Sequence, residues 1–153
     1  MTEVRVVSIK GRLRELGPRL EHAQHIVYAG RRMTMGGWDL PMSPFHNPYP
    51  IKSAGSVERA VELYSSYLMF NPWLVERAAA ELAERGPRAC FGCWCDVEAG
   101  APCHGPVLSS AVAALTEPIP PLTTAWASVY APQRVPIRGR ETVHLGPVGA
   151  GAL

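Results

Sequence analysis

The sequence predicts a small α/β domain, in which helices flank a mostly parallel, Rossmann-like sheet. Three short segments, residues 4–9, 25–29 and 89–95, are apolar over most of their length. Segments of this kind are typical of strands that are covered on both faces. Helical patterns separate the second segment from the third and also follow the third. Strands that alternate with helices in this way favour a parallel sheet.

Between the first two predicted strands, residues 10–24 have leucines at helical spacing. Gly17 and Pro18 interrupt this pattern, so we expect a short or broken helix there. After the second strand, residues 33–53 form a long loop with four prolines and several aromatic residues. Loops of this length in a compact domain usually bind something or are disordered, and the aromatic side chains argue against disorder because they usually pack. We therefore expect an ordered loop that lines a pocket.

Residues 56–70 give the clearest helical pattern, with a capping serine at the start and one apolar stripe. Asn71 and Pro72 then favour the end of this helix and the start of another. We expect the second helix over residues 72–85, where Gly and Pro follow it. A last helix is predicted over residues 103–115, with its apolar side chains on one side.

The composition is that of an ordinary globular chain: 153 residues, of which 47% are hydrophobic and 18% are charged. We expect one domain over residues 1–116 and a Pro- and Gly-rich extension over residues 117–153, partly docked and frayed at its end. The net charge of +2 gives no strong signal for nucleic-acid binding. Neither a membrane-spanning run nor a signal peptide is evident, so we expect a cytoplasmic protein with reduced thiols.

All four cysteines fall within residues 88–108, where the third predicted strand is followed by the last predicted helix. Alternation along a strand would place Cys93 and Cys95 on one face and Trp94, as a core residue, on the other. A helix that begins near Cys103 would offer unpaired backbone N–H groups, which favour a thiolate or a bound anion. This junction is therefore the first place to look for chemistry.

Ligands of open α/β sheets bind beyond the carboxyl ends of the strands, so three loops should meet there. The loop after the second strand supplies Arg31, which suits a phosphate or a carboxylate. The long loop supplies Asn47, whose amide could read the edge of a base or sugar. The third loop supplies Cys95, Cys103 and His104. The alternative is that Arg31 is a solvated charge and the Asn-Pro pair only a turn.

Three interpretations of the cysteines stay open. Three thiols and an imidazole form an accepted zinc ligand set, here Cys93, Cys95, Cys103 and His104, but the strand spacing would require distortion. A second interpretation is a nucleophilic thiol at the start of the helix, beside the histidine. The third is structural packing, because buried cysteine behaves as a small hydrophobe, and it applies best to Cys90 and Cys93.

Three motifs together resemble a known family. They are Tyr-x-Gly-Arg at residues 28–31, Pro-x-x-Asn-Pro-aromatic at residues 44–49, and Cys-Trp-Cys…Cys-His-Gly-x-Val-Leu at residues 93–108. In this order, over roughly residues 4–116, they resemble the uncharacterised bacterial and phage family numbered 4326 among the domains of unknown function. The family usually has Trp-Gly-Asn-Pro-Phe in the loop, where this chain has Phe-His-Asn-Pro-Tyr, and an acidic residue where this chain has Pro106.

The resemblance implies positions rather than a reaction. We expect a domain that binds a nucleotide-like or other anionic small molecule, with or without enzymatic activity. The predicted ligand-binding residues are Tyr28, Gly30, Arg31, Asn47 and Pro48. The predicted catalytic residues are Cys103, His104 and Cys95.

The alternative function is a zinc-stabilised module that binds a protein, such as a phage factor that engages a host protein. The sequence contains no P-loop, Gly-x-Gly-x-x-Gly or Gly-x-Ser-x-Gly motif. Kinase, dinucleotide dehydrogenase and serine hydrolase functions therefore have no support from the sequence.

Overall fold

The computed structural model describes residues 4–116 of the chain. They belong to one compact unit, Met1–Pro118. The predicted extension over residues 117–153 lies outside the described residues. Within the described part, no helix combines the length and the apolar character that crossing a membrane requires.

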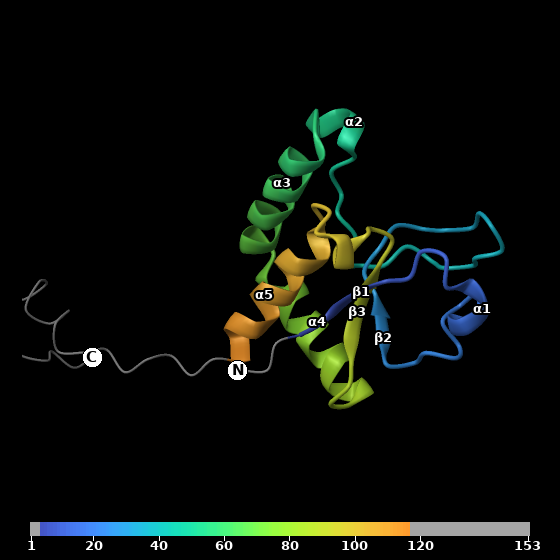
Figure 1. Cartoon of the computed structure of the whole chain (residues 1–153). Coiled ribbons are helices and arrows are strands. Elements are labelled where there is room, and N and C mark those ends of the chain that lie inside the picture. The colour runs from blue at the N-terminus through green and yellow to red at the C-terminus, as the bar shows by residue number, and fades with distance from the viewer. Residues whose placement is uncertain (1–3, 117–153) are drawn as a thin grey trace, which may run out of the picture. The chain divides into compact units, whose positions relative to one another are not determined.

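A parallel sheet lies at the centre of this unit (Figure 1). Its three strands are β1 (Val6–Ser8), β2 (Ile26–Tyr28) and β3 (Cys90–Cys93), and β3 lies between the other two. Both outer strands pair with β3 in parallel, as the apolar segments of the sequence predict. Since β3 is central, the loops that leave β2 and β3 start side by side at one edge of the sheet.

The predicted helices are also present. They are α1 (Leu13–Leu16), α3 (Val57–Phe70), α4 (Pro72–Arg85) and α5 (His104–Thr116). The structure also contains two short helices that the sequence did not predict: α2 (Ile51–Ala54), at the end of the long loop, and the 3-10 helix η1 (Val97–Ala99). The predicted third strand is shorter than expected, because it ends at Cys93 and the chain bends at the next two residues. This early end changes the geometry of the cysteines.

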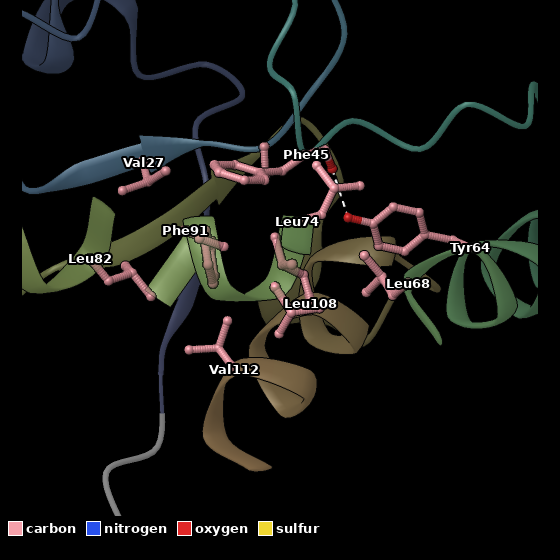
Figure 2. Close-up of a cluster of buried hydrophobic side chains, with 12 residues drawn as sticks. Val27, Phe45, Tyr64, Leu68, Leu74, Leu82, Phe91, Leu108 and Val112 are labelled. Atoms are coloured by element: carbon pink, nitrogen blue, oxygen red, sulfur yellow. Dashed lines mark hydrogen bonds between the residues drawn. The ribbon is translucent and has the colours of Figure 1, made fainter. Parts of the chain in front are cut away.

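Side chains of the strands alternate between two cores. Val27 and Phe91 belong to the core on the side of α3, α4 and α5, together with Leu74, Leu108 and Val112 (Figure 2). Ile26 and Cys90 belong to the second core, which α1 and the loop after β2 cover. In Figure 1, α1 accordingly lies across the sheet from α5. Both faces of the sheet are buried, which explains why the strands read as nearly continuous apolar runs.

Helix α3 begins with the cap that the sequence predicts, since the side chain of Ser56 accepts a hydrogen bond from the backbone N–H of Arg59 at 3.0 Å. Tyr64, from the predicted apolar stripe, is fully buried. Its hydroxyl donates to the carbonyl oxygen of Phe45 at 2.7 Å (Figure 2), and burial raises the pKa of this phenol above its usual range. The bond fastens the long loop to α3.

Gly92 lies in the centre of β3, where there is no room for a side chain. A Cβ atom there would lie 2.5 Å from Cγ2 of Ile26 and 3.1 Å from Cγ2 of Ile9. Both isoleucines are buried in the core on the α1 side, where close packing leaves them little freedom to move. Glycine at this position therefore allows the three strands to approach each other under that core.

We expect Gly92→Ala to lower the free energy of unfolding by about 1–3 kcal/mol, the usual cost of overpacking a core. The measurement is the urea midpoint by circular dichroism, compared with the wild-type chain. A midpoint equal to that of the wild type would contradict the close packing described for the centre of β3.

Candidate functional site

A cavity of about 330 Å³ lies beyond the carboxyl ends of β2 and β3. Its walls come from the loop after β2, the long loop, the first turns of α3 and the segment that joins β3 to α5. Among the predicted site residues, it is lined by Tyr28, Gly30, Arg31, Asn47, Cys95, Cys103 and His104. Pro48, which is exposed, and Cys93, which is fully buried, are not part of the lining. The volume is that of a site for a small molecule.

Apolar and aromatic side chains make up the rest of the wall: Met33, Tyr49, Ile51, Val57, Ala60, Val61, Trp94 and Pro102. The sequence singled out the long loop and its aromatic residues. It did not single out the start of α3, because the apolar stripe of that helix does not show where the core ends and the cavity begins. The apolar wall is typical of ligand pockets that have few polar groups.

The placement of Trp94 confirms one part of the sequence prediction and corrects another. Trp94 packs against the core on the α1 side of the sheet, as expected, but it is not separated from Cys95, because both residues line the cavity. The reason is the bend after Cys93, which ends the alternation of a strand. The indole of Trp94 packs edge-on against Trp38, with 5.8 Å between the ring centroids, so its orientation is held from behind.

Asn47 holds the long loop in place. Its side-chain nitrogen donates to the carbonyl oxygen of Ala60 in α3 at 2.9 Å, and its side-chain oxygen accepts from the backbone N–H of Tyr49 at 2.9 Å. The residue is buried, at 9% exposure. Both ends of the amide therefore take part in anchoring the loop. Asn47 also lines the cavity, and its predicted contact with the edge of a base or sugar stays a prediction.

Arg31 extends from the loop after β2 and is oriented by this same anchor. Its Nε and Nη2 donate to the backbone carbonyl oxygen of Asn47, at 3.2 and 2.9 Å. Among the described residues, Nη1 of Arg31 has no hydrogen-bond partner. An exposed guanidinium that is fixed along one edge can offer its remaining donors to an anionic group.

Tyr28 and Gly30 shape the wall at the end of β2. The hydroxyl of Tyr28 donates to the carbonyl oxygen of Arg31, and the phenol ring lies over Gly30. A Cβ atom on Gly30 would come within 2.6 Å of ring carbon Cζ of Tyr28, so glycine makes room for the ring. Burial, with a smaller contribution from Cys93, raises the pKa of Tyr28 to about 12, which keeps the phenol neutral.

Three of the four cysteines meet at the cavity. The Sγ atoms of Cys93, Cys95 and Cys103 all lie within 4.8 Å of one another, and we refer to these residues as the thiol cluster. The Sγ atoms of Cys93 and Cys103 are 3.2 Å apart. A straight strand would hold Cys93 and Cys95 farther apart. From the sequence, a metal site at these cysteines would require a distorted strand. The bend after Cys93 is that distortion.

Cys90, the fourth cysteine, has a structural role. It is 1% exposed and packs in the core on the α1 side of the sheet, with Ile26 and Leu16. This confirms the packing interpretation for Cys90. Cys93 is also fully buried, so it packs in the interior and at the same time belongs to the thiol cluster.

His104 stands beside the thiol cluster without joining it. Its Nε2 lies 2.6 Å from the carbonyl oxygen of Ala29, and because a carbonyl only accepts, Nε2 carries the proton. Its ring packs edge-on against Tyr64, with centroids 5.1 Å apart. Desolvation lowers the pKa of His104, so the imidazole is neutral and Nδ1 keeps its lone pair. The structure thus joins three of the four predicted metal ligands and directs the fourth to the end of β2.

The three thiols differ in acidity because they share protons. Hydrogen bonds from Cys103 and Cys93 lower the pKa of Cys95 well below its usual value, against the effect of burial. The bonds to Cys103 and Cys95, together with burial, raise the pKa of Cys93 far above its usual value. For Cys103 the bond with Cys93 lowers the pKa, but the bond to Cys95 and burial outweigh it, so the pKa of Cys103 is raised. The protein without metal therefore presents one thiolate, Cys95, at the cavity wall.

In protein stripped of metal by a chelator, we expect iodoacetamide to modify Cys95 rapidly at about pH 6, where an ordinary thiol of pKa about 8.5 is almost fully protonated. The rate should fall only at a pH well below the range in which an ordinary thiol titrates, because the pKa of Cys95 is lowered. Peptide mass spectrometry identifies the modified residue, and Cys90, buried in the core, should stay unmodified as the internal control. Equal labelling of both cysteines would contradict this assignment.

Comparisons with known proteins show which family the chain is similar to. A viral protein named "Uncharacterized protein R718", from Acanthamoeba polyphaga mimivirus, is 39% identical over 87 residues, which cover 54% of this chain and 62% of the viral protein. No solved structure matches the chain, so the predicted similarity to Rossmann-like domains stays a prediction. The profile of the family described as "Domain of unknown function (DUF4326)" matches residues 16–114, which include every residue that lines the cavity. The chain therefore belongs to the DUF4326 family.

Proposed function

We propose that the chain binds a small anionic ligand with a flat ring, such as a nucleotide or a nucleoside derivative, in the cavity beyond β2 and β3. One observation carries this proposal: a single cavity gathers an arginine, a neutral histidine and reactive sulfur within largely aromatic and apolar walls. The cavity also lies where ligands of parallel α/β sheets usually bind.

Arg31 would contact the anionic group of the ligand. Its guanidinium is already held by the carbonyl oxygen of Asn47, so little conformational entropy is lost when an anion binds to it. The N-terminus of α5, which begins at His104 on the cavity wall, adds the positive end of a helix dipole. Both features favour a negative charge in the cavity.

Tyr49 and Trp94 would contact the ring of the ligand. Each is supported from behind by another aromatic residue: Tyr49 by Tyr67, with centroids 6.2 Å apart, and Trp94 by Trp38. Aromatic side chains that are held in this way offer large contact area at low entropic cost. A flat ligand ring therefore fits the chemistry of the wall better than an aliphatic chain with several polar groups.

If the protein is an enzyme, the cavity also supplies its reactive groups. Cys95 is the member of the thiol cluster that is partly exposed, and it lines the cavity with Cys103 and His104. The thiolate of Cys95 can add to an electrophilic carbon of a bound ligand: a sulfur–carbon bond forms while a π bond at that carbon breaks and its electron pair moves to the neighbouring atom. The neutral imidazole of His104, with its lone pair on Nδ1, is a suitable proton acceptor.

A zinc-stabilised protein-binding module is the second candidate function, and the thiol cluster favours it. Zinc held by Cys93, Cys95 and Cys103 would join the end of β3 to the start of α5. In such a module most of the folding free energy depends on the metal, so chelation should unfold the chain. A chain that stays folded after chelation would exclude this candidate and leave the ligand-binding proposal in place.

We expect at least one nucleoside phosphate or sugar phosphate in a panel to raise the melting temperature. At about 100 times its dissociation constant, such a ligand stabilises the native state by about 2.7 kcal/mol. Arg31→Gln should weaken binding at least about tenfold, because hydrogen bonds to charged groups contribute about 1.5–3 kcal/mol.

Arg32→Gln is the matched control. Arg32 is the next residue, is also exposed, and does not line the cavity, so its loss should leave the affinity unchanged. If no member of the panel stabilises the protein, or if both variants weaken binding equally, this function is wrong.

A further inference from the structure

The thiol cluster is open to the cavity on one side and closed on the other. Cys95 and Cys103 line the cavity, whereas Cys93 lies behind them and is fully buried. Cys93 is the last residue of β3, Cys95 lies in the bend after it, and Cys103 directly precedes α5. Seven residues, which include η1, separate Cys95 from Cys103. The fold, rather than a local motif, brings the sulfur atoms together.

We propose that the thiol cluster holds one thiophilic divalent metal ion, such as Zn²⁺, whose fourth coordination position opens into the cavity. This inference rests on the ligand-binding function proposed for the same cavity, and it adds that the bound ligand supplies the fourth donor atom. Three protein ligands with one open position are typical of zinc sites that bind substrates, whereas structural zinc sites are closed by four protein ligands.

The spacing of the sulfur atoms suits a metal of this kind. With a Zn–S bond of about 2.3 Å, two sulfurs on one tetrahedral zinc are about 3.8 Å apart. In the structure, Cys93 and Cys103 are 3.2 Å apart and all three sulfurs lie within 4.8 Å of each other. Small side-chain rotations are enough to reach the required distances. Three thiolates are soft ligands and select zinc and similar ions over magnesium or calcium.

The fourth position has no donor from the described part of the chain. No histidine, aspartate or glutamate there brings a ligand atom within 4.8 Å of all three sulfurs. The hydrogen bond from Nε2 of His104 to Ala29 leaves Nδ1 free, but neither ring nitrogen lies within 4.8 Å of all three sulfurs. The nearest acidic side chains in the sequence also have other partners: Asp96 pairs with Lys10 at 3.5 Å, and Glu98 accepts from the backbone N–H of Ser8 at 3.1 Å.

The start of α5 supports one of the ligands. The backbone N–H of Gly105 donates to Sγ of Cys103 at 3.3 Å, and such second-shell bonds orient a metal ligand and stabilise its charge. A Cβ atom on Gly105 would lie 2.7 Å from Cγ1 of Val6, so glycine allows α5 to begin this close to β1. The site therefore has an oriented ligand before any metal binds.

Cobalt substitution of the full chain tests the site, because Co²⁺ bound tetrahedrally by thiolates absorbs strongly in the visible range. We expect one Co²⁺ per chain. The variants Cys93→Ser, Cys95→Ser and Cys103→Ser should each weaken Co²⁺ binding by more than about 100-fold, since losing even a second-shell partner costs about 10- to 100-fold. Cys90→Ser, in the core on the other face of the sheet, should bind Co²⁺ like the wild type. If all four variants bind Co²⁺ as tightly as the wild type, the proposed metal site is wrong.

The open position is tested by adding azide or imidazole to the Co²⁺ protein. Either small donor should shift the visible spectrum, because it enters the fourth position through the cavity. A spectrum that responds to neither donor means a closed, structural metal site and overturns the open position. Ile51→Trp narrows the cavity at an exposed wall residue and should weaken the response to imidazole without changing the number of metal ions bound.

The proposed metal site and the proposed ligand site can be tested independently, so that one can prove wrong without the other. Cobalt stoichiometry and the azide response need no organic ligand, so they stand even if the phosphate panel gives no binding. For a ligand found in that panel, affinity should be at least tenfold higher in the metal-loaded than in the chelated protein. Equal affinities would overturn the role of the metal in binding and leave the ligand site intact.

Discussion

The site depends on the position of β3 and on the residue at which it stops. Parallel pairing on both sides places the end of β3 beside the end of β2, and the four buried residues of the strand leave no freedom in its register. Because the strand ends at Cys93, the chain bends there and brings the sulfur of Cys95 close to that of Cys93. One more pair of strand residues would separate the two sulfurs and remove Trp94 from the cavity wall.

The opposite wall is held by polar bonds to α3. The amide of Asn47 bonds to Ala60, and the hydroxyl of Tyr64 bonds to Phe45, so two buried hydrogen bonds fasten a loop rich in proline to one helix. Unsatisfied polar groups in these places would cost free energy, which favours a single loop conformation. A wall that is ordered in advance holds the arginine on its rim in place, so that under the proposed function an anion binds without first ordering the loop.

The cavity offers a positive charge and polarisable sulfur atoms at two different places. Arg31 offers a hard positive charge at an exposed position, whereas the thiol cluster offers polarisable sulfur at a partly buried one. The neutral imidazole of His104 stands next to the sulfurs and is tied to the end of β2. A ligand that uses both regions needs an anionic group and a donor or electrophilic atom on the same small molecule, with a ring between aromatic walls.

The sequence alone determined the elements of this protein and the neighbourhood of its site. Apolar runs, the Ser56 cap and the Asn71-Pro72 junction act locally, and parallel strands always bring their carboxyl ends to one edge, so Arg31, Cys95 and Cys103 could be placed in one cleft. Only the tertiary structure decided that the Asn47 amide anchors a loop, that His104 faces Ala29 and that Trp94 shares a wall with Cys95. The first two outcomes depend on backbone partners far away in the sequence, and the third depends on where β3 ends. Local patterns contain neither kind of information.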